Sequence, residues 1–240
     1  DTSAFALYFI KNFMRLKLKK LICTHYSGQM DLFNAGAKGY IFTKDGVNEI
    51  IETPKGYTGS FDDDLSLKIL KEEADIVCTN PPFSRAIDYW NIIIGSGKKF
   101  LIISNITNVI NTAYISYFMN KNIWAGYNRI DKYLNYKCEI VEASGHWYTN
   151  IEITNRPKYK HLKIVPLDEI PEKYKKYDDA GTLLADNGFI PNDYDKPFGV
   201  SARPILNGIL EKGYKIVYDK KYVPYINKKE KFARVLIQKE

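Results

Sequence analysis

The chain has 240 residues, of which 45% are hydrophobic and 26% are charged, and its formal net charge is +7. This composition is typical of a globular protein with room for one sizeable α/β domain, alone or with a smaller appendage. The longest apolar stretches have the length of strands, which argues against a transmembrane helix, and no signal peptide is visible. The three cysteines, Cys23, Cys78 and Cys138, are far apart. They form no metal-binding pattern, and their number suits a reducing cytoplasm.

The N-terminal part alternates helical and strand-like patterns. Residues 3–16 place apolar side chains near helical spacing, which predicts an amphipathic helix. Residues 20–24 predict a short buried strand that ends in a polar cluster containing Tyr26. Residues 39–53 predict a hairpin with its turn at Lys44-Asp45-Gly46.

The alternation continues through the middle of the chain. Helices are predicted at 64–73, 85–95 and 107–120, strands at 75–79, 99–104 and 123–127, and a closing pair of β segments at 138–153. This order implies an α/β fold with a mainly parallel sheet covered by helices on both faces. Ligands bind at the carboxyl ends of such strands, so we expect Tyr26, Asn80 and Asn105 at one rim.

The pattern changes after residue 154. Prolines interrupt the chain repeatedly, and regular elements are predicted only at 202–212 and 232–238. Residues 156–240 carry 18 Lys/Arg against 12 Asp/Glu, a balance of +6, whereas residues 1–155 carry 17 against 16, a balance of +1. Lysines mixed with tyrosines suit phosphate contacts and base stacking, although a lysine-rich solvated surface has the same composition. We therefore expect a main domain at 1–155 and an irregular basic extension at 156–240.

The most informative segment is Asn80-Pro81-Pro82-Phe83, which directly follows the apolar run 74–79. The Asn80 side-chain oxygen and the Pro81 carbonyl can both accept hydrogen bonds from an exocyclic NH2, and prolines supply no competing N–H. Phe83 offers a ring face on which a base can stack. A plain turn after a strand would also explain the tetrapeptide alone. Together with the preceding strand, it favours a site that holds a planar, amino-bearing group.

Methyl transfer to such an amine needs no nucleophilic side chain. The two acceptors would favour a more tetrahedral nitrogen whose lone pair points at the methyl group of a sulfonium donor, S-adenosylmethionine. Methylation of a ring carbon needs a thiolate, usually presented as Pro-Cys, and no cysteine here follows a proline. No histidine begins the His-x-Glu of the zinc deaminases, and Gly95-Ser96-Gly97-Lys98 runs from helix to strand, opposite to a phosphate-binding loop. We expect no metal.

Candidate cofactor-binding residues precede the second predicted helix. Phe61 could cover one face of the cofactor's adenine, and Ser60 or Asp62 could accept its amino group. An ordinary acidic helix N-terminus would also explain the acids here. Tyr26 could meet the ribose or the adenine. No Gly-rich cofactor loop precedes the first predicted helix, and we expect that loop to lie upstream of Asp1 or to be atypical.

In their order along the chain, several segments resemble the EcoRI-type adenine-specific DNA methyltransferases. They are residues 5–26, 75–84, 98–105, 147–151 and 198–200, of which 75–84 matches the family's catalytic segment closely. Where the family tends to have Gly-Asp-Phe, this chain has Gly59-Ser60-Phe61, so Asp62 would replace the adenine-binding acid.

The resemblance implies a Rossmann-like class I methyltransferase fold with an antiparallel closing strand. The implied activity is N6-methylation of an adenine flipped out of double-stranded DNA, in a restriction–modification or phage system with a possible cognate endonuclease. Asn80 to Phe83 would be catalytic and the basic tail would help target recognition. Asn105 and Trp147 would contact substrate, although a buried structural tryptophan explains Trp147 equally well. An RNA or protein-glutamine amino-methyltransferase, and a non-catalytic nucleic-acid-binding subunit, remain alternatives.

Overall fold

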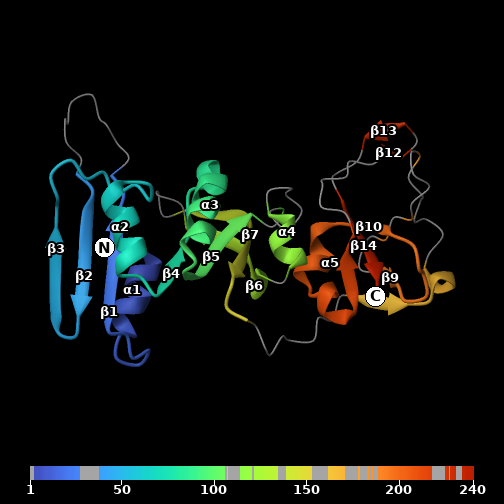
Figure 1. The fold of residues 1–240 in the computed structure, drawn as a ribbon, viewed down its shortest axis with the longest axis horizontal. Helices are drawn as coiled ribbons and strands as arrows, with labels where there is room; N and C mark the ends of the chain where they lie inside the picture. Colours follow the sequence, from blue (N-terminus) through green and yellow to red (C-terminus); the bar gives the residue numbers. More distant parts are fainter. Residues whose placement is uncertain are drawn as a thin grey trace. The chain divides into compact units, whose positions relative to one another are not determined.

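The computed structural model describes residues 3–27, 38–105, 107, 114–120, 122–134, 139–152, 162–170, 178, 183, 185, 189–217, 225–226, 228–230 and 234–240 (Figure 1). These residues form a mixed α/β structure with several sheets. The chain divides into two compact units, Asp1–Phe100 and Leu101–Glu240. The functional boundary expected near residue 155 stays a prediction. In the described ranges, no helix has the length and apolar character needed to cross a membrane.

The first unit follows the predicted order of elements. They are α1 (Ala4–Lys11), β1 (Lys20–His25), β2 (Tyr40–Asp45), β3 (Asn48–Glu52), α2 (Asp64–Glu72), β4 (Ile76–Thr79), the 3-10 turn η1 (Phe83–Arg85) and α3 (Ala86–Ser96). Most boundaries agree with the predictions within two residues. The exception is α1, which stops five residues early. There Asn12 caps the helix: both its backbone N–H (3.0 Å) and its side-chain amide (2.8 Å) donate to the Tyr8 carbonyl, and the next N–H, of Phe13, bonds to Ile10 instead of Phe9.

Strands β1, β2 and β3 form an antiparallel sheet in sequence order, which confirms the predicted hairpin. Ile41 and Phe42 on β2 are buried, whereas β3 is exposed along its whole length. The turn between β2 and β3 contains Gly46, whose φ of +57° suits glycine. This sheet carries the end of β1, and hence Tyr26.

Three backbone segments cross closely at the end of β1. Gly59 has a φ of +80°, and a Cβ built on it would lie 1.8 Å from the His25 carbonyl oxygen. A Cβ on Gly39 would lie 2.3 Å from the Gly59 nitrogen. The Ser27 N–H donates to the Thr58 carbonyl (3.1 Å), which ties the same crossing together. The loop before α2 can therefore lie against the end of β1 only because glycines occupy the contact points.

Strand β4 leads through η1 into α3, whose buried face anchors the segment between them. Trp90 is fully buried and packs edge-to-face on Phe100, with ring centroids 6.0 Å apart. Tyr89 and Ile93 are buried beside it along α3. The helix ends at Gly97, whose φ of +68° is that of a left-handed helix cap. The prediction that this Gly-rich stretch ends a helix is confirmed.

In the second unit, β5 (Lys99–Asn105), β6 (Trp124–Leu134) and β7 (Ile140–Thr149) form antiparallel pairs, β5 with β7 and β7 with β6. The prediction of two β segments within 138–153 is wrong, because β7 is one strand paired with β6 along most of its length. Strand β6 likewise continues seven residues beyond the predicted end at Tyr127. Helix α4 (Ile115–Met119) confirms the end of the helix predicted at 107–120; residues 108–113 lie outside the described part.

The basic tail contains more regular structure than the proline pattern predicts. Its elements are β8 (Lys163–Val165), η3 (Leu167–Glu169), β9 (Phe189–Pro191), β10 (Phe198–Val200), α5 (Ala202–Leu206), η4 (Ile209–Lys212), β11 (Tyr214–Ile216), β12 (Tyr225–Ile226), β13 (Lys229–Glu230) and β14 (Val235–Lys239). Strands β10, β14 and β11 form an antiparallel sheet whose core includes the fully buried Phe198, Val235 and Ile237. The strands have two to five residues, which is too short for their periodicity to be recognised.

The described strand pairings confirm an α/β fold but do not display a mainly parallel sheet. The pairs with a described register are antiparallel, except β8 with β9. Strand β1 belongs to a different sheet from β4 and β5. The prediction that Tyr26 shares one sheet rim with Asn80 and Asn105 is therefore wrong. The backbone crossing at Gly59, and not a shared sheet, sets where Tyr26 lies.

The crossing can be tested by adding one methyl group. Gly56 has a φ of +79°, nearly that of Gly59, but a Cβ built on it meets no atom within 4 Å. We expect Gly56→Ala to lower the free energy of unfolding by about 1–2 kcal/mol, the cost of left-handed backbone alone. Gly59→Ala should cost a further ~1–3 kcal/mol, because the backbone must shift. Urea denaturation measures both losses, and equal losses would contradict the crossing.

Candidate active site

Asn80 is exposed at the end of β4, where its amide can meet a ligand. Pro81 next to it is buried and Pro82 is exposed, so the segment is anchored on one side and open on the other. The Arg85 N–H donates to the Pro82 carbonyl (3.1 Å), which closes the turn η1 directly after the prolines. The side chain of Phe83 lies outside the described part of the structure, and its stacking role stays a prediction.

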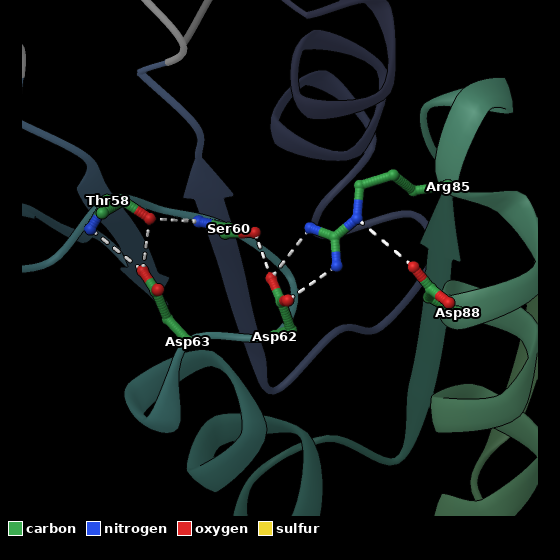
Figure 2. Close-up of polar contacts among 6 residues, drawn as sticks. All are labelled: Thr58, Ser60, Asp62, Asp63, Arg85 and Asp88. Carbon is green, nitrogen blue, oxygen red and sulfur yellow. Dashed lines mark hydrogen bonds and ion pairs between the residues drawn. The ribbon is translucent and has the colours of Figure 1, made fainter. Parts of the chain in front are cut away.

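The loop of residues 58–63, called here the cofactor loop, is held by the carboxylate of Asp63. Asp63 Oδ2 accepts hydrogen bonds from Thr58 N (2.9 Å) and Thr58 Oγ1 (2.8 Å) (Figure 2). It also accepts one from Gly59 N (3.0 Å). The Ser60 N–H adds a bond to Thr58 Oγ1 (3.2 Å). Asp63 is the residue before α2, where the partial positive charge of the helix N-terminus favours a carboxylate. One anion thus joins the loop to the helix that follows it.

Asp62 reaches in the other direction, toward the turn after Asn80 (Figure 2). Its Oδ2 accepts a hydrogen bond from Arg85 Nη2 (2.7 Å) and its Oδ1 accepts one from Arg85 Nη1 (3.3 Å). This is a bidentate contact between carboxylate and guanidinium. Ser60 Oγ also donates to Asp62 Oδ1. Arg85 Nε lies 3.4 Å from Asp88 Oδ2 on its own helix. The candidate cofactor residues Ser60 and Asp62 are therefore joined to the segment that carries Asn80.

The ion pair keeps Asp62 ionised. Hydrogen bonding to Arg85, followed by that from Ser60, lowers the pKa of Asp62 to about 2. The side chains of Arg85 and Asp62 remain 43% and 40% exposed. Solvent screens such a pair, so it contributes little to stability. The pair is therefore more important for positioning the loop at the site than for stabilising the fold.

Aromatic contacts connect the same parts a second time. The Arg85 guanidinium lies over the Phe61 ring, 4.6 Å from its centroid, and Phe61 meets Tyr89 edge-to-face with centroids 5.1 Å apart. Tyr89 in turn hydrogen-bonds Thr79, and burial raises the pKa of its phenol. Thr79 immediately precedes Asn80 and Arg85 follows it by five residues. Phe61 is thus linked to both sides of the Asn80 segment.

The described cysteines are unsuited to nucleophilic catalysis at neutral pH. Cys78, two residues before Asn80, has its pKa raised to about 11 by burial, so it stays a thiol. Burial also raises the pKa of Cys23. Cys138 lies outside the described residues. In the part of the chain that the structure describes, no group of three or more His, Cys, Asp or Glu could hold a metal ion.

The remaining predicted site residues lie elsewhere. Tyr26 is 61% exposed and directly follows the crossing with Gly59, next to the cofactor loop. Asn105 belongs to the second unit, where its Oδ1 accepts from Thr107 N (2.8 Å) and Thr107 Oγ1 (2.7 Å).

Trp147 is half-buried on β7 of the same unit. A Cβ built on Gly126 would lie 2.6 Å from the Trp147 Cβ, so this tryptophan packs against the Gly126 backbone. Trp147 is therefore not the fully buried tryptophan considered from the sequence, although it has a packing contact. Contacts of Asn105 and Trp147 with substrate stay predictions.

Sequence reasoning missed the residues that join the site together: Thr58, Asp63, Arg85 and Tyr89. Arg85 pairs with Asp62 across 23 positions of the chain, and such a pairing leaves no periodic signal. The one available hint is the capping position of Asp63 just before a helix.

Comparisons with known proteins now decide the family. The family described as "Adenine-specific methyltransferase EcoRI" matches residues 1–234. The chain belongs to this family. No solved structure matches it significantly.

Three curated relatives are type II methyltransferases by name. M.MgeORF184P of Mycoplasma genitalium is 35% identical over 178 residues, which are 65% of this chain and 52% of that protein. M.EcoRI of Escherichia coli is 28% identical over 229 residues, 82% of this chain and 69% of that protein. M.MpnI of Mycoplasma pneumoniae is 29% identical over 196 residues, 73% and 58% respectively. The chain therefore spans between about half and two thirds of the length of these relatives.

The protonation of Asp62 tests the ion pair directly. Its pKa is lowered from 3.8 to about 2, so Asp62 contributes to stability above pH 3.8 and loses that contribution as the pH falls toward 2. We expect carboxyl-carbon NMR titration to find a pKa near 2, and Arg85→Gln to return it toward 3.8. Asp88→Asn is the control and should change it little, because Asp88 contacts only Nε. An unshifted Asp62 in the unsubstituted protein would contradict the pairing.

Proposed function

We propose that this chain is part of a site-specific DNA methyltransferase that transfers the methyl group of S-adenosylmethionine to the N6 amine of an adenine in double-stranded DNA. The observation that carries the proposal is the exposed Asn80 at the end of β4, joined through Arg85 and Tyr89 to the cofactor loop. Membership of an adenine-specific methyltransferase family supports it.

The target amine would be held by acceptors alone. Asn80 Oδ1 and the Pro81 carbonyl would each accept one N–H of the adenine NH2, which leaves the nitrogen lone pair free to attack. Pro82 offers no competing N–H, and Phe83 would stack on the base after it leaves the duplex. Cys78 remains protonated near neutral pH, so its sulfur does not compete for the methyl group as a thiolate. Asn105 and Trp147 would contribute further contacts to the substrate.

Residues of the cofactor loop fit an adenosine. Phe61 presents an apolar ring, Tyr26 is exposed next to Gly59 of the same loop, and Ser60 and Asp62 offer acceptors for an exocyclic amine. A carboxylate has about four acceptor positions. Contacts with Ser60 and Arg85 occupy two of those on Asp62 Oδ1 and one on Oδ2. When bound, S-adenosylmethionine supplies an activated methyl group; the chain's own residues position it.

The proposal includes the finer features expected from the family. The methyltransferase domain would have a Rossmann-like class I fold over residues 1–155, with the basic region 156–240 contacting DNA and the enzyme acting in the cytoplasm. The relatives' names place them among type II methyltransferases. We extend that restriction–modification setting, with a cognate endonuclease as possible partner, to this chain.

A methyl-transfer assay on full-length protein tests the activity. With tritiated S-adenosylmethionine and mixed-sequence duplex DNA, we expect label in N6-methyladenine. Asn80→Ala should lower turnover by about 10²-fold or more, while affinity for S-adenosylhomocysteine stays within a few-fold, because the side chain acts on the target amine. Asn48→Ala, in the exposed hairpin strand β3, is the matched control. Label in RNA or a protein glutamine instead, or calorimetry without S-adenosylhomocysteine binding, would refute this activity.

The role of the tail is tested by its salt dependence. Lys212 and Lys215 are exposed on η4 and β11. If they contact phosphate, Lys212→Ala and Lys215→Ala should each weaken DNA binding and reduce the slope of log K against log salt by about 0.9. Lys55→Ala removes the same charge outside the tail and serves as control. Unchanged slopes in both tail variants would contradict a DNA contact at this face.

A further inference from the structure

We propose that Arg85 is a positioning residue that holds the cofactor loop in register with the segment carrying Asn80. This inference rests on the proposed function, because register between the two matters only if one binds the methyl donor and the other the acceptor. Neither the family pattern nor the sequence assigns a role to this arginine.

Arg85 is the point at which three contacts meet. Its N–H donates to the Pro82 carbonyl, so its backbone is part of the turn that follows Asn80. Its guanidinium bonds both oxygens of Asp62 and lies over the ring of Phe61, both on the cofactor loop. One side chain thus holds the loop by two contacts, an ion pair with the Asp62 carboxylate and a cation–π contact with the Phe61 ring.

The guanidinium is itself oriented. Its Nε lies 3.4 Å from Asp88 Oδ2, and its Nη1 and Nη2 point to Asp62 (Figure 2). The planar fork of arginine sets both distance and angle, whereas a lysine would supply charge without a fixed plane. The loop is held on its other side by Asp63 and by the backbone crossing at Gly59. Arg85, together with the contact of Tyr89 on Phe61, therefore sets where the free side of the loop lies.

This arrangement should affect rate much more than stability. An exposed ion pair contributes little to folding, so losing it leaves the fold intact. Methyl transfer, by contrast, requires the reacting atoms within about 3–3.5 Å and in line, and a misplacement of about 1 Å can cost about 100-fold in rate. The loop and the Asn80 segment would still bind their ligands separately after the tether is lost.

The experiment compares Arg85→Gln, Asp62→Asn, their double variant and Arg85→Lys in the full-length protein, with Asp88→Asn as matched control. Single-turnover methylation of duplex DNA, calorimetry with S-adenosylhomocysteine and thermal unfolding are measured for each. We expect Arg85→Gln to lower the transfer rate about 10- to 100-fold, with cofactor affinity within about threefold and thermal stability nearly unchanged. The double variant should be no slower than the slower single variant, since both remove one contact. Arg85→Lys should not restore the rate, and Asp88→Asn should stay within about twofold of the unsubstituted rate.

Several results would overturn the inference. They are an unchanged transfer rate in Arg85→Gln, full activity in Arg85→Lys, additive losses in the double variant, or a loss confined to cofactor affinity. The last would mean that Arg85 only supports cofactor binding by the loop and does not set its register with the Asn80 segment.

Hydrogen exchange separates failure of this inference from failure of the proposed function. Arg85→Gln should speed exchange of the amides at 58–62 whatever the substrate, whereas Asp88→Asn should not. If the unsubstituted protein methylates RNA or protein instead of DNA, the proposed function fails and the same rate comparison is made on that substrate. If it methylates nothing, both fail. Unchanged exchange at 58–62 overturns the tether by itself.

Discussion

The close backbone crossing at Gly59 is the constraint on which the candidate site depends. Because Gly59 carries no Cβ, the loop before α2 can lie against the carbonyl of His25 at the end of β1. Once the loop is there, the carboxylate of Asp63 gathers the donors of Thr58 and Gly59 and joins them to the N-terminus of α2. The consequence is a short, ordered loop whose next residues, Phe61 and Asp62, project toward the turn after Asn80.

Buried contacts and exposed charged contacts have different effects at the site. Buried contacts, such as Tyr89 with Thr79 and Trp90 with Phe100, fix α3 and the strand that precedes Asn80. Exposed charged contacts, above all that of Asp62 with Arg85, contribute little to stability but orient the loop toward the segment that carries Asn80. Such a division suits a site that must hold two ligands in line.

The chemistry proposed for this site fits its electrostatics. A neutral amide and a proline carbonyl accept hydrogen bonds from a weakly basic amine without a proton having to be removed first. Burial keeps the Cys78 thiol protonated near the same strand end, so this cysteine does not compete as a nucleophile. Membership of an adenine-specific methyltransferase family supports the same proposed chemistry.

The sequence by itself determined the local elements of the first unit, the family and the segment Asn80 to Phe83. Those signals are local: apolar spacing predicts α2 and β4, and prolines after a strand mark an abrupt end. The sequence did not predict features that depend on pairing between distant segments, or strands that are too short to show a pattern. The single strand β7, the small sheet of the basic tail and the sheet to which β1 belongs depend on which segments pair, and strands of three residues carry no measurable period. Only the tertiary structure decided that Arg85 meets Asp62 and Phe61, because a contact between residues 23 positions apart arises from the fold and not from the spacing of neighbours.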